Sequence, residues 1–289
     1  MRYDFQHVAI DIPLVLVDHS SYAFEDEESD RTVEVSWQLI DEDLDPADVV
    51  EPLAQQVSDA YGDNAEVLSS DPITVLGGPA RRVVQRVVLE GGELTTWLVG
   101  TGNKPVAMIL KYSATARTAK EEKEFAHVLA SIAPADKPWV RKGMPGFVRR
   151  QAGRITLEVP TGFSYPSEYR FATFDSSLRL LLSYTARLET RPADFSKLIY
   201  VPDKRAEKLQ TVNEEAEAAT LDVGSGSDTR WDVERVRGDE VLERAAVRRL
   251  ALNVRPDLAF HLTGVASGDG IKALDAAWPQ LKGTLTKGK

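Results

Sequence analysis

The residues that could carry out chemistry are few in this 289-residue chain. The four histidines, His7, His19, His127 and His261, do not stand in a spacing typical of metal ligands or of a nucleophile and its base. No cysteine occurs, which excludes disulfides, thiol nucleophiles and cysteine-ligated metals. We therefore interpret the histidines as structural and predict no metal site.

Acidic and glycine-rich segments also lack a catalytic pattern. The clusters at 25–28 and 41–43 are turn segments without the apolar surroundings that raise a carboxyl pKa for acid–base work. Glycines at 77–78 precede a strand pattern, and those at 268–270 open a helix pattern without the lysine and hydroxyl of a phosphate-binding loop. We predict no catalytic residue and no cofactor, and hence a protein that is not an enzyme.

Composition and charge narrow the class of partner. Hydrophobic residues make up 43% and charged residues 28%, as in ordinary globular proteins. The formal net charge is −10, and the acidic excess lies within residues 1–140, which disfavours nucleic acid. The first residues lack an apolar signal core, and no apolar run is long enough to span a bilayer. We expect a cytoplasmic protein without stable membrane insertion.

The sequence contains an internal repeat, which predicts how the strands and helices that would position a site are arranged. At a constant shift of 147 residues, segment 8–13 aligns with 155–160, and both alternate apolar residues before ending at proline. The same shift aligns Tyr22 with Tyr169. Two copies argue for a tandem duplication, because a solenoid needs three or more repeats.

The repeat predicts three regions. The first copy covers residues 1–136 and the second covers residues 154–289. Residues 137–153 are rich in proline, glycine and basic residues, and we interpret them as a linker. A solvated linker near an acidic first copy is favoured over a nuclear signal or an anion-binding patch.

Residue periodicity predicts the elements of each copy. Strands are expected near 8–12, 20–26, 31–40, 73–77, 81–90, 93–100 and 105–113, and again near 155–159, 168–174, 178–188, 230–236, 241–254 and 258–266. A first helix is expected to end at 61 and to start at 46, or near 51 if Pro52 prevents the earlier start. Further helices are expected near 118–132, 203–219 and 269–285. This order predicts an α+β fold of two tandem domains, each a twisted antiparallel sheet with helices on one face.

Two predicted strands carry apolar residues on both faces. Residues 106–110 and 178–182 lack the alternation of a sheet with one wet face. Their second face therefore needs a cover, which is either the sister domain or a second subunit, or else an apolar segment of a partner lying in a groove.

The layout resembles the DcrB-like, PsbP-like domain family. The resemblance rests on the opening strand that ends in proline, the Tyr-x-Phe strand at 22–24, the Gly-Gly-Pro-Ala turn at 77–80 and the closing helix that ends at 129–132. It covers residues 5–134 well and 153–286 more loosely, because the second copy lacks the Gly-Gly-Pro turn.

Within that family the chain resembles Eag-type chaperones of type VI secretion effectors, which shield hydrophobic helices of a client. The resemblance implies a chaperone or adaptor with a protein client, acting as a monomeric pseudo-dimer or as a homodimer. The two-sided strands and neighbouring apolar residues supply the partner-binding residues that we predict, Trp37, Trp97, Met108, Leu110, Leu180, Leu182 and Leu252.

Two alternatives stay open. An assembly subunit or immunity-like protein would bind a folded partner without hydrophobic helices. An enzyme or small-ligand sensor would need a site assembled from polar residues that are scattered in the sequence.

Overall fold

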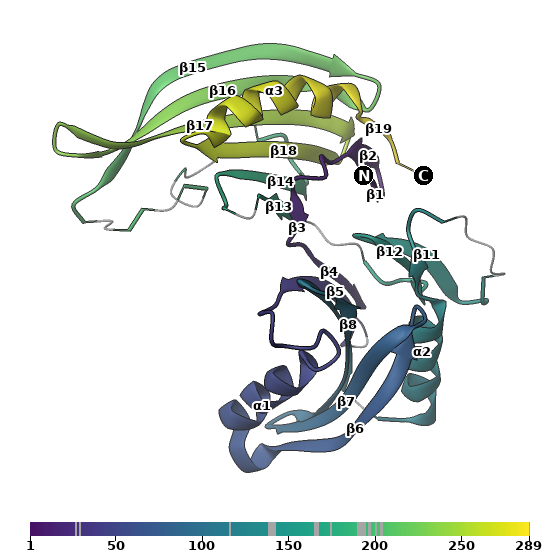
Figure 1. The fold of residues 1–289 in the computed structure, drawn as a ribbon. Helices are drawn as coiled ribbons and strands as arrows, with labels where there is room; N and C mark the ends of the chain where they lie inside the picture. The colour runs from purple at the N-terminus through teal and green to yellow at the C-terminus, as the bar shows by residue number, and fades with distance from the viewer. Residues whose placement is uncertain are drawn as a thin grey trace. The chain divides into compact units, whose positions relative to one another are not determined.

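The computed structural model describes residues 1–289 except 27, 29, 116, 138–142, 165–167, 174, 190–194, 196–197, 200, 203–204 and 289. The described residues form a mostly antiparallel α+β fold with three α-helices. They divide into two compact units (Figure 1). Unit 1 contains Met1–His19 and Ser167–Lys289, and unit 2 contains Ser20–Pro166.

Unit 2 is built on a six-stranded antiparallel sheet of order β4-β5-β9-β8-β7-β6. These strands are β4 (Ser21–Asp26), β5 (Arg31–Leu39), β9 (Val106–Ala114), β8 (Gly92–Asn103), β7 (Gly78–Leu89) and β6 (Ala65–Val75). A smaller sheet joins β10 (Ala133–Pro134), β12 (Ile155–Pro160) and β11 (Phe147–Ala152). The predicted strands of the first copy from 20–26 to 105–113 correspond to strands of the main sheet, whereas the predicted strand 8–12 is β2 (Val8–Asp11) of unit 1.

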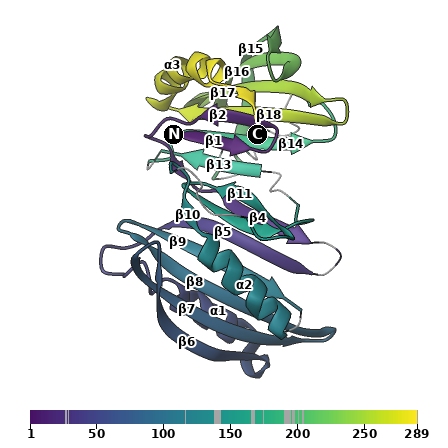
Figure 2. The same ribbon diagram turned by 90° about the vertical axis from the view of Figure 1, so that its right-hand side faces the viewer.

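The two helices of unit 2 cover opposite faces of its main sheet (Figure 2). Leu98 of β8 packs in one cluster with Val50 of α1 (Val50–Tyr61). Its neighbour Trp97 stacks on Phe125 of α2 (Ala119–Ser131), with ring centroids 5.8 Å apart. The prediction of helices on one face is therefore wrong for this unit. Residues 106–110 are apolar on both faces because each face has a helix of the same unit.

The helix ends follow the predicted signals. Helix α1 starts at Val50, so that Pro52 stands in its first turn, where its missing N–H breaks no hydrogen bond. The N-cap of α2 is Thr118, whose side chain accepts from the backbone N–H of Lys120 at 3.2 Å. A 3-10 turn, η1 (Gly62–Asn64), links α1 to β6.

Unit 1 is built on a seven-stranded antiparallel sheet of order β15-β16-β17-β18-β14-β13-β3. Its strands are β15 (Lys208–Leu221), β16 (Gly224–Arg237), β17 (Glu240–Arg255), β18 (Leu258–Ser267), β14 (Leu178–Thr185), β13 (Glu168–Ala172) and β3 (Val17–Asp18). Helix α3 (Gly270–Gly283) packs on β14, β17 and β18.

The helix predicted near 203–219 is wrong. Residues 208–221 form β15, which pairs with β16 along nearly its whole length. The run of glutamate and alanine favours a helix by propensity, but tertiary pairing overrides that preference. Residues 203–204 lie outside the described residues.

The two main sheets share one strand order, so their residues can be aligned across the sheets. One line of paired residues in unit 2, here called the aromatic row, is Phe24, Val33, Tyr112, Trp97, Val84 and Ser69. The corresponding line in unit 1, here called the charged row, is Phe171, Leu180, Gly264, Arg248, Arg230 and Glu215. Both rows start from residues that the shift of 147 aligns.

Each unit is completed by a hairpin that lies outside the predicted copy forming most of that unit. The hairpin of β1 (Arg2–Phe5) and β2 (Val8–Asp11) pairs with β19 (Thr286–Lys287) at the end of the chain. The equivalent hairpin β11–β12 pairs with β10, directly after α2. The compact units thus cross the boundaries 1–136, 137–153 and 154–289, which remain a prediction about the duplication.

The predicted linker is not wholly a connection. Its residues 147–152 form β11, and residues 138–142 lie outside the described residues. Within the described part of the chain, no helix is long and apolar enough to cross a membrane.

Candidate functional site

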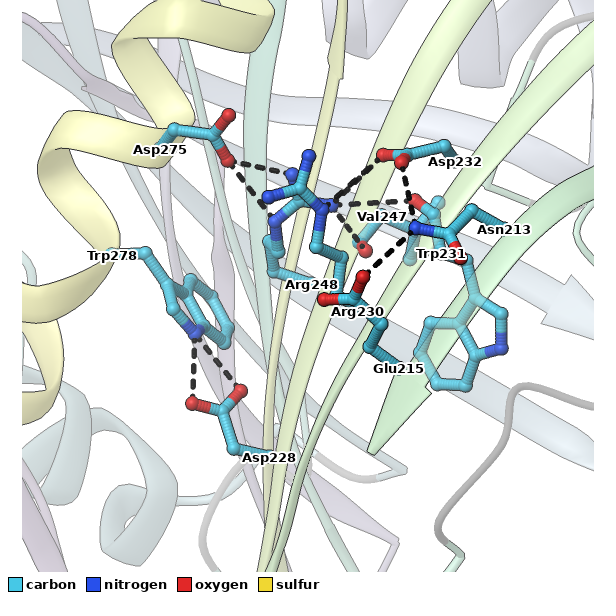
Figure 3. Close-up of polar contacts among 10 residues, drawn as sticks. All are labelled: Asn213, Glu215, Asp228, Arg230, Trp231, Asp232, Val247, Arg248, Asp275 and Trp278. Carbon is cyan, nitrogen blue, oxygen red and sulfur yellow. Dashed lines mark hydrogen bonds and ion pairs between the residues drawn. The ribbon is translucent and has the colours of Figure 1, made fainter. Parts of the chain in front are cut away.

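A pocket of about 490 Å³ opens in unit 1 between α3 and the strands β15 and β16. Charged side chains dominate its walls, and several are drawn in Figure 3. Its lining residues are Glu215, Ala216, Glu217, Asp228, Arg230, Arg248, Asp275, Trp278, Pro279 and Lys282. We call it the charged pocket.

Arg248 is the most deeply buried cation of this pocket, with 4% of its side chain exposed. Its Nε and Nη2 donate to one carboxylate oxygen of Asp275 at 3.1 and 2.6 Å (Figure 3). Its Nη1 donates to the backbone carbonyls of Trp231 and Val247 at 3.3 and 3.0 Å. These bonds offset the loss of hydration of a buried guanidinium and fix its orientation.

Asp228 supplies a buried carboxylate on the same side of the sheet. Its two oxygens accept from the indole Nε1 of Trp278 at 3.0 and 3.3 Å. The ammonium group of Lys282 also donates to it. Because Trp278 and Lys282 both lie on α3, Asp228 ties that helix to β16.

The rim of the pocket on β15 is acidic and open to solvent. Glu215 accepts from Asn213 Nδ2 at 3.2 Å, and the Glu217 carboxylate lies 3.9 Å from Lys282 Nζ with 75% of its side chain exposed. The lining contains four carboxylates and three cationic side chains. The carboxylates outnumber the cations, so the formal net charge of the lining is negative.

The equivalent position in unit 2 shows that the fold does not require these charges. Arg248 stands where the aromatic row has Trp97, and Gly264 stands where it has Tyr112. Trp97 and Tyr112 lie 5.4 Å apart between ring centroids and form an apolar cluster with Phe125. The aromatic row shows that apolar residues stabilise this position in the fold. A charged residue in place of such an apolar residue is expected mainly at functional sites.

A second hollow of about 550 Å³ lies in unit 2 beside α1. Helix α1 packs mainly over β6, β7 and β8, and residues of β5 and β9 on the same sheet face line the hollow. We call this hollow the groove. Its lining residues are Glu34, Ser36, Gln38, Leu53, Gln56, Val57, Ala60, Tyr61, Gln85, Val87, Leu89, Leu94, Thr96, Leu98, Ile109 and Lys111.

The apolar lining of the groove comes mainly from α1, β7 and β8, and its β5 end is polar, with Glu34, Ser36 and Gln38. Further polar lining residues are Gln56, Gln85 and Thr96. Two exposed apolar side chains border it, Tyr61 at 47% and Leu89 at 44% exposure. At the polar end the Lys111 ammonium lies 3.6 Å from Glu34. The buried side chain of Gln85 donates to Ala54 O at 2.9 Å, which fastens α1 to the sheet and keeps the groove open.

The structure does not bring the seven predicted partner-binding residues into either hollow. Six of them have buried side chains, and Trp37 is half-buried. The buried ones are Trp97, Met108, Leu110, Leu180, Leu182 and Leu252. A partner could reach these six only if the packing changed, so their role in partner binding stays a prediction.

Sequence reasoning missed the residues of the charged pocket. The signal was present in the predicted strand 241–254, where Arg248 and Arg249 interrupt an apolar run. Residues 245–252 are all buried, and two adjacent arginines in such a strand must each find partners on opposite faces. This sequence pattern indicates buried arginines, but it does not identify the residues that form hydrogen bonds and ion pairs with them.

Arg249 forms a separate buried network on the opposite face. Its Nη2 lies 3.1 Å from His261 Nδ1, and His261 Nε2 lies 2.7 Å from Thr185 Oγ1. Because a guanidinium only donates, Nδ1 must accept and Nε2 carries the proton of a neutral ring. Burial, together with the charge of Arg249, lowers the pKa of His261 to about 4.

Metal ligation has no candidate in the part of the chain that the structure describes, because no group of three or more His, Asp or Glu side chains is arranged to hold an ion. His127 instead lies 2.6 Å from Glu158 of β12, and His261 is held within the network described above.

No family model matches the chain, and no curated protein matches it. Among solved structures, the chain is similar to the T6SS immunity protein TplEi of Pseudomonas aeruginosa complexed with "L" peptide, at 9% identity and TM-score 0.45, covering 99% of this chain and 96% of that one. It is also similar to the Tle4–Tli4 complex at 10% identity and TM-score 0.40, with the same coverage.

The PsbP protein (CyanoP) of Synechocystis is similar at 16% identity and TM-score 0.31, covering 45% of this chain and 88% of that one. These are distant similarities that do not assign the chain to a family.

Proposed function

We propose that the chain is a non-enzymatic protein that binds a partner protein, and that the groove of unit 2 receives an apolar segment of that partner. The observation that carries this proposal is the open sheet face beside α1, with apolar walls and exposed Tyr61 and Leu89 at its border. Apolar concave surfaces of this kind are typical binding sites.

The shape of the groove favours a helix as the bound segment. Sheet faces in α+β folds are covered by packed helices, and here α1 covers only part of its face. A partner helix beside α1 would place apolar residues against Leu94 and Ile109, as in helix-in-groove recognition. The Glu34–Lys111 pair at the polar end would set the register of that helix.

The finer proposal is a chaperone or adaptor that shields hydrophobic helices of a type VI secretion effector, built from two diverged PsbP-like domains. The family resemblance of the sequence motivates this choice. The groove supplies a physical means, because its apolar walls would replace water around the apolar face of a client helix.

The proposal is tested by purifying the tagged protein from its native host at endogenous level, without detergent, and identifying bound proteins by mass spectrometry. Val57→Asp puts a charge on the groove wall, and Gln55→Asp adds the same charge to an exposed position of α1 outside the groove. We expect one partner with apolar helices to remain with the wild type and Gln55→Asp and to be lost with Val57→Asp.

Circular dichroism and urea unfolding of each variant establish that its fold is intact. A partner that stays bound to correctly folded Val57→Asp would remove the groove from the proposal. A partner set without any apolar helix would remove the chaperone role.

The second candidate is an assembly subunit or immunity-like protein that binds a folded surface. The charged pocket favours it, because exposed carboxylates on β15 suit a polar partner. This alternative predicts a fully soluble partner whose binding is unaffected by Val57→Asp.

A further inference from the structure

The outer strand of unit 1 is unusually open. Among the described residues, β15 pairs with β16 on one side only, and it ends the strand order of its sheet. Residues 210–218 are exposed without interruption, and Glu215 and Glu217 among them line the open charged pocket. The backbone N–H and C=O groups at the other edge are therefore a template for one more strand.

The equivalent edge of unit 2 is protected, whereas this one is not. Strand β6 carries Pro72, which pairs with Arg81 next to the Asp71–Arg82 pair. By register, Pro72 corresponds to Ala218 on β15, which pairs with Ser227 next to the Glu217–Asp228 pair. Proline blocks an edge because it has no N–H to donate, and it is tolerated where that N–H would face outward. Ala218 therefore presents an edge donor that β6 lacks.

The charges on β15 define what can pair with it. Glu215 and Glu217 alternate along the strand, and both lie on the face of the charged pocket. A strand added at this edge would place side chains opposite them at the same spacing. Opposite charges in such cross-strand positions are favourable, and like charges are not.

We propose that β15 binds an extended segment of a partner protein by strand addition, and that the segment carries Lys or Arg at alternate positions facing Glu215 and Glu217. Backbone hydrogen bonds would supply affinity, and the charge alternation would supply selectivity. This inference goes beyond the proposed function, because it concerns a second site in the other unit.

The test uses the full chain and a fluorescein-labelled peptide of about nine residues that alternates Lys and Val, enough to pair along most of a strand. A peptide with Glu in place of Lys is the comparator. We expect the Lys peptide to bind and the Glu peptide to bind at least about tenfold more weakly, measured by fluorescence anisotropy. Equal binding of the two peptides would overturn the proposal.

Two variants separate charge from backbone pairing. Glu215→Gln with Glu217→Gln should weaken Lys-peptide binding by about tenfold, whereas Glu240→Gln at the exposed start of β17 should leave it unchanged. Ala218→Pro, the residue that β6 carries naturally, should abolish binding while pairing with β16 persists. Unchanged binding by either β15 variant contradicts strand addition at this edge.

Hydrogen exchange provides the structural readout. Amides of residues 213–221 should exchange more slowly in the wild type when the Lys peptide is present. Val57→Asp should not change peptide binding, so failure of this site is distinguishable from failure of the groove.

Discussion

The aromatic row of unit 2 and the charged row of unit 1 occupy equivalent places in sheets of the same strand order, yet they have opposite chemistry. In unit 2, Trp97 and Tyr112 fill the space under α2 with Phe125. In unit 1, Arg248 lines a pocket beside α3, and Gly264 lies close under Leu274 and Trp278 of that helix. The same fold therefore accommodates either aromatic or charged residues at these positions. We infer that the residue types there reflect the function of each unit.

The largest effect is expected from moving the charge into the aromatic row. Trp97→Arg replaces a fully buried indole by a guanidinium among the rings of Tyr112 and Phe125, and we expect it to lower the free energy of unfolding of unit 2 by at least about 4 kcal/mol. Hydrogen exchange in β8 and β9 during urea titration measures it. The matched control is Trp97→Phe, which removes no hydrogen bond among the described residues, where the indole Nε1 has no partner. A loss of less than about 1 kcal/mol would contradict our account of the two rows.

The second prediction concerns pH and unit 1. An unfolded histidine takes up its proton near pH 6.5, whereas His261 in the folded chain does so near 4. The stability that the neutral ring contributes is therefore complete above about pH 6.5 and is lost as the pH falls toward 4, by roughly 3 kcal/mol. Urea unfolding across this range measures the loss, and His261→Gln should reduce it. A pH dependence unchanged by that substitution would show that other groups cause it.

Gly264→Ala probes how tightly unit 1 is packed where unit 2 holds Tyr112. A Cβ at this position would lie 2.5 Å from Leu274 Cδ1 and 3.2 Å from Trp278 Cζ3. We expect a loss of about 1 to 3 kcal/mol, measured by urea unfolding. The control is Gly283→Ala at the end of α3, where a Cβ meets nothing within 4 Å. If both variants were equally stable, the helix would have room to move away.

The smallest effect is expected from removing both partners of the Arg248–Asp275 ion pair of the charged pocket. Arg248→Met with Asp275→Asn should change the unfolding free energy by no more than about 1 kcal/mol, because it removes both charges of the pair and leaves neither partner uncompensated by the other. A much larger loss would show that the pair is kept for stability. The single change Arg248→Met, which leaves Asp275 without its cation, is the comparison.

The sequence predicted those parts of the fold that depend on local periodicity. Alternation located β4 and β5, and Thr118 marked the start of α2. It failed at 208–221, where pairing outweighs helix propensity.

The candidate sites could not be predicted in the same way. The charged pocket depends on strand register, which brings Glu215 beside Arg230 and Arg230 beside Arg248 across three strands. No spacing in the sequence encodes that juxtaposition. The groove depends on how much of a sheet face α1 leaves uncovered, which a helical pattern does not specify.

The order in which the two hairpins are synthesised differs from the order of the strands with which they pair. Strand β10 emerges from the ribosome when β1–β2 is already available and β11–β12 has not yet been made, so the wrong hairpin meets this strand first. At shift 147, Glu158 of the correct hairpin corresponds to Asp11, which is one methylene shorter. Glu158 lies 2.6 Å from His127 on α2, which ties the β11–β12 hairpin to the helix that precedes β10.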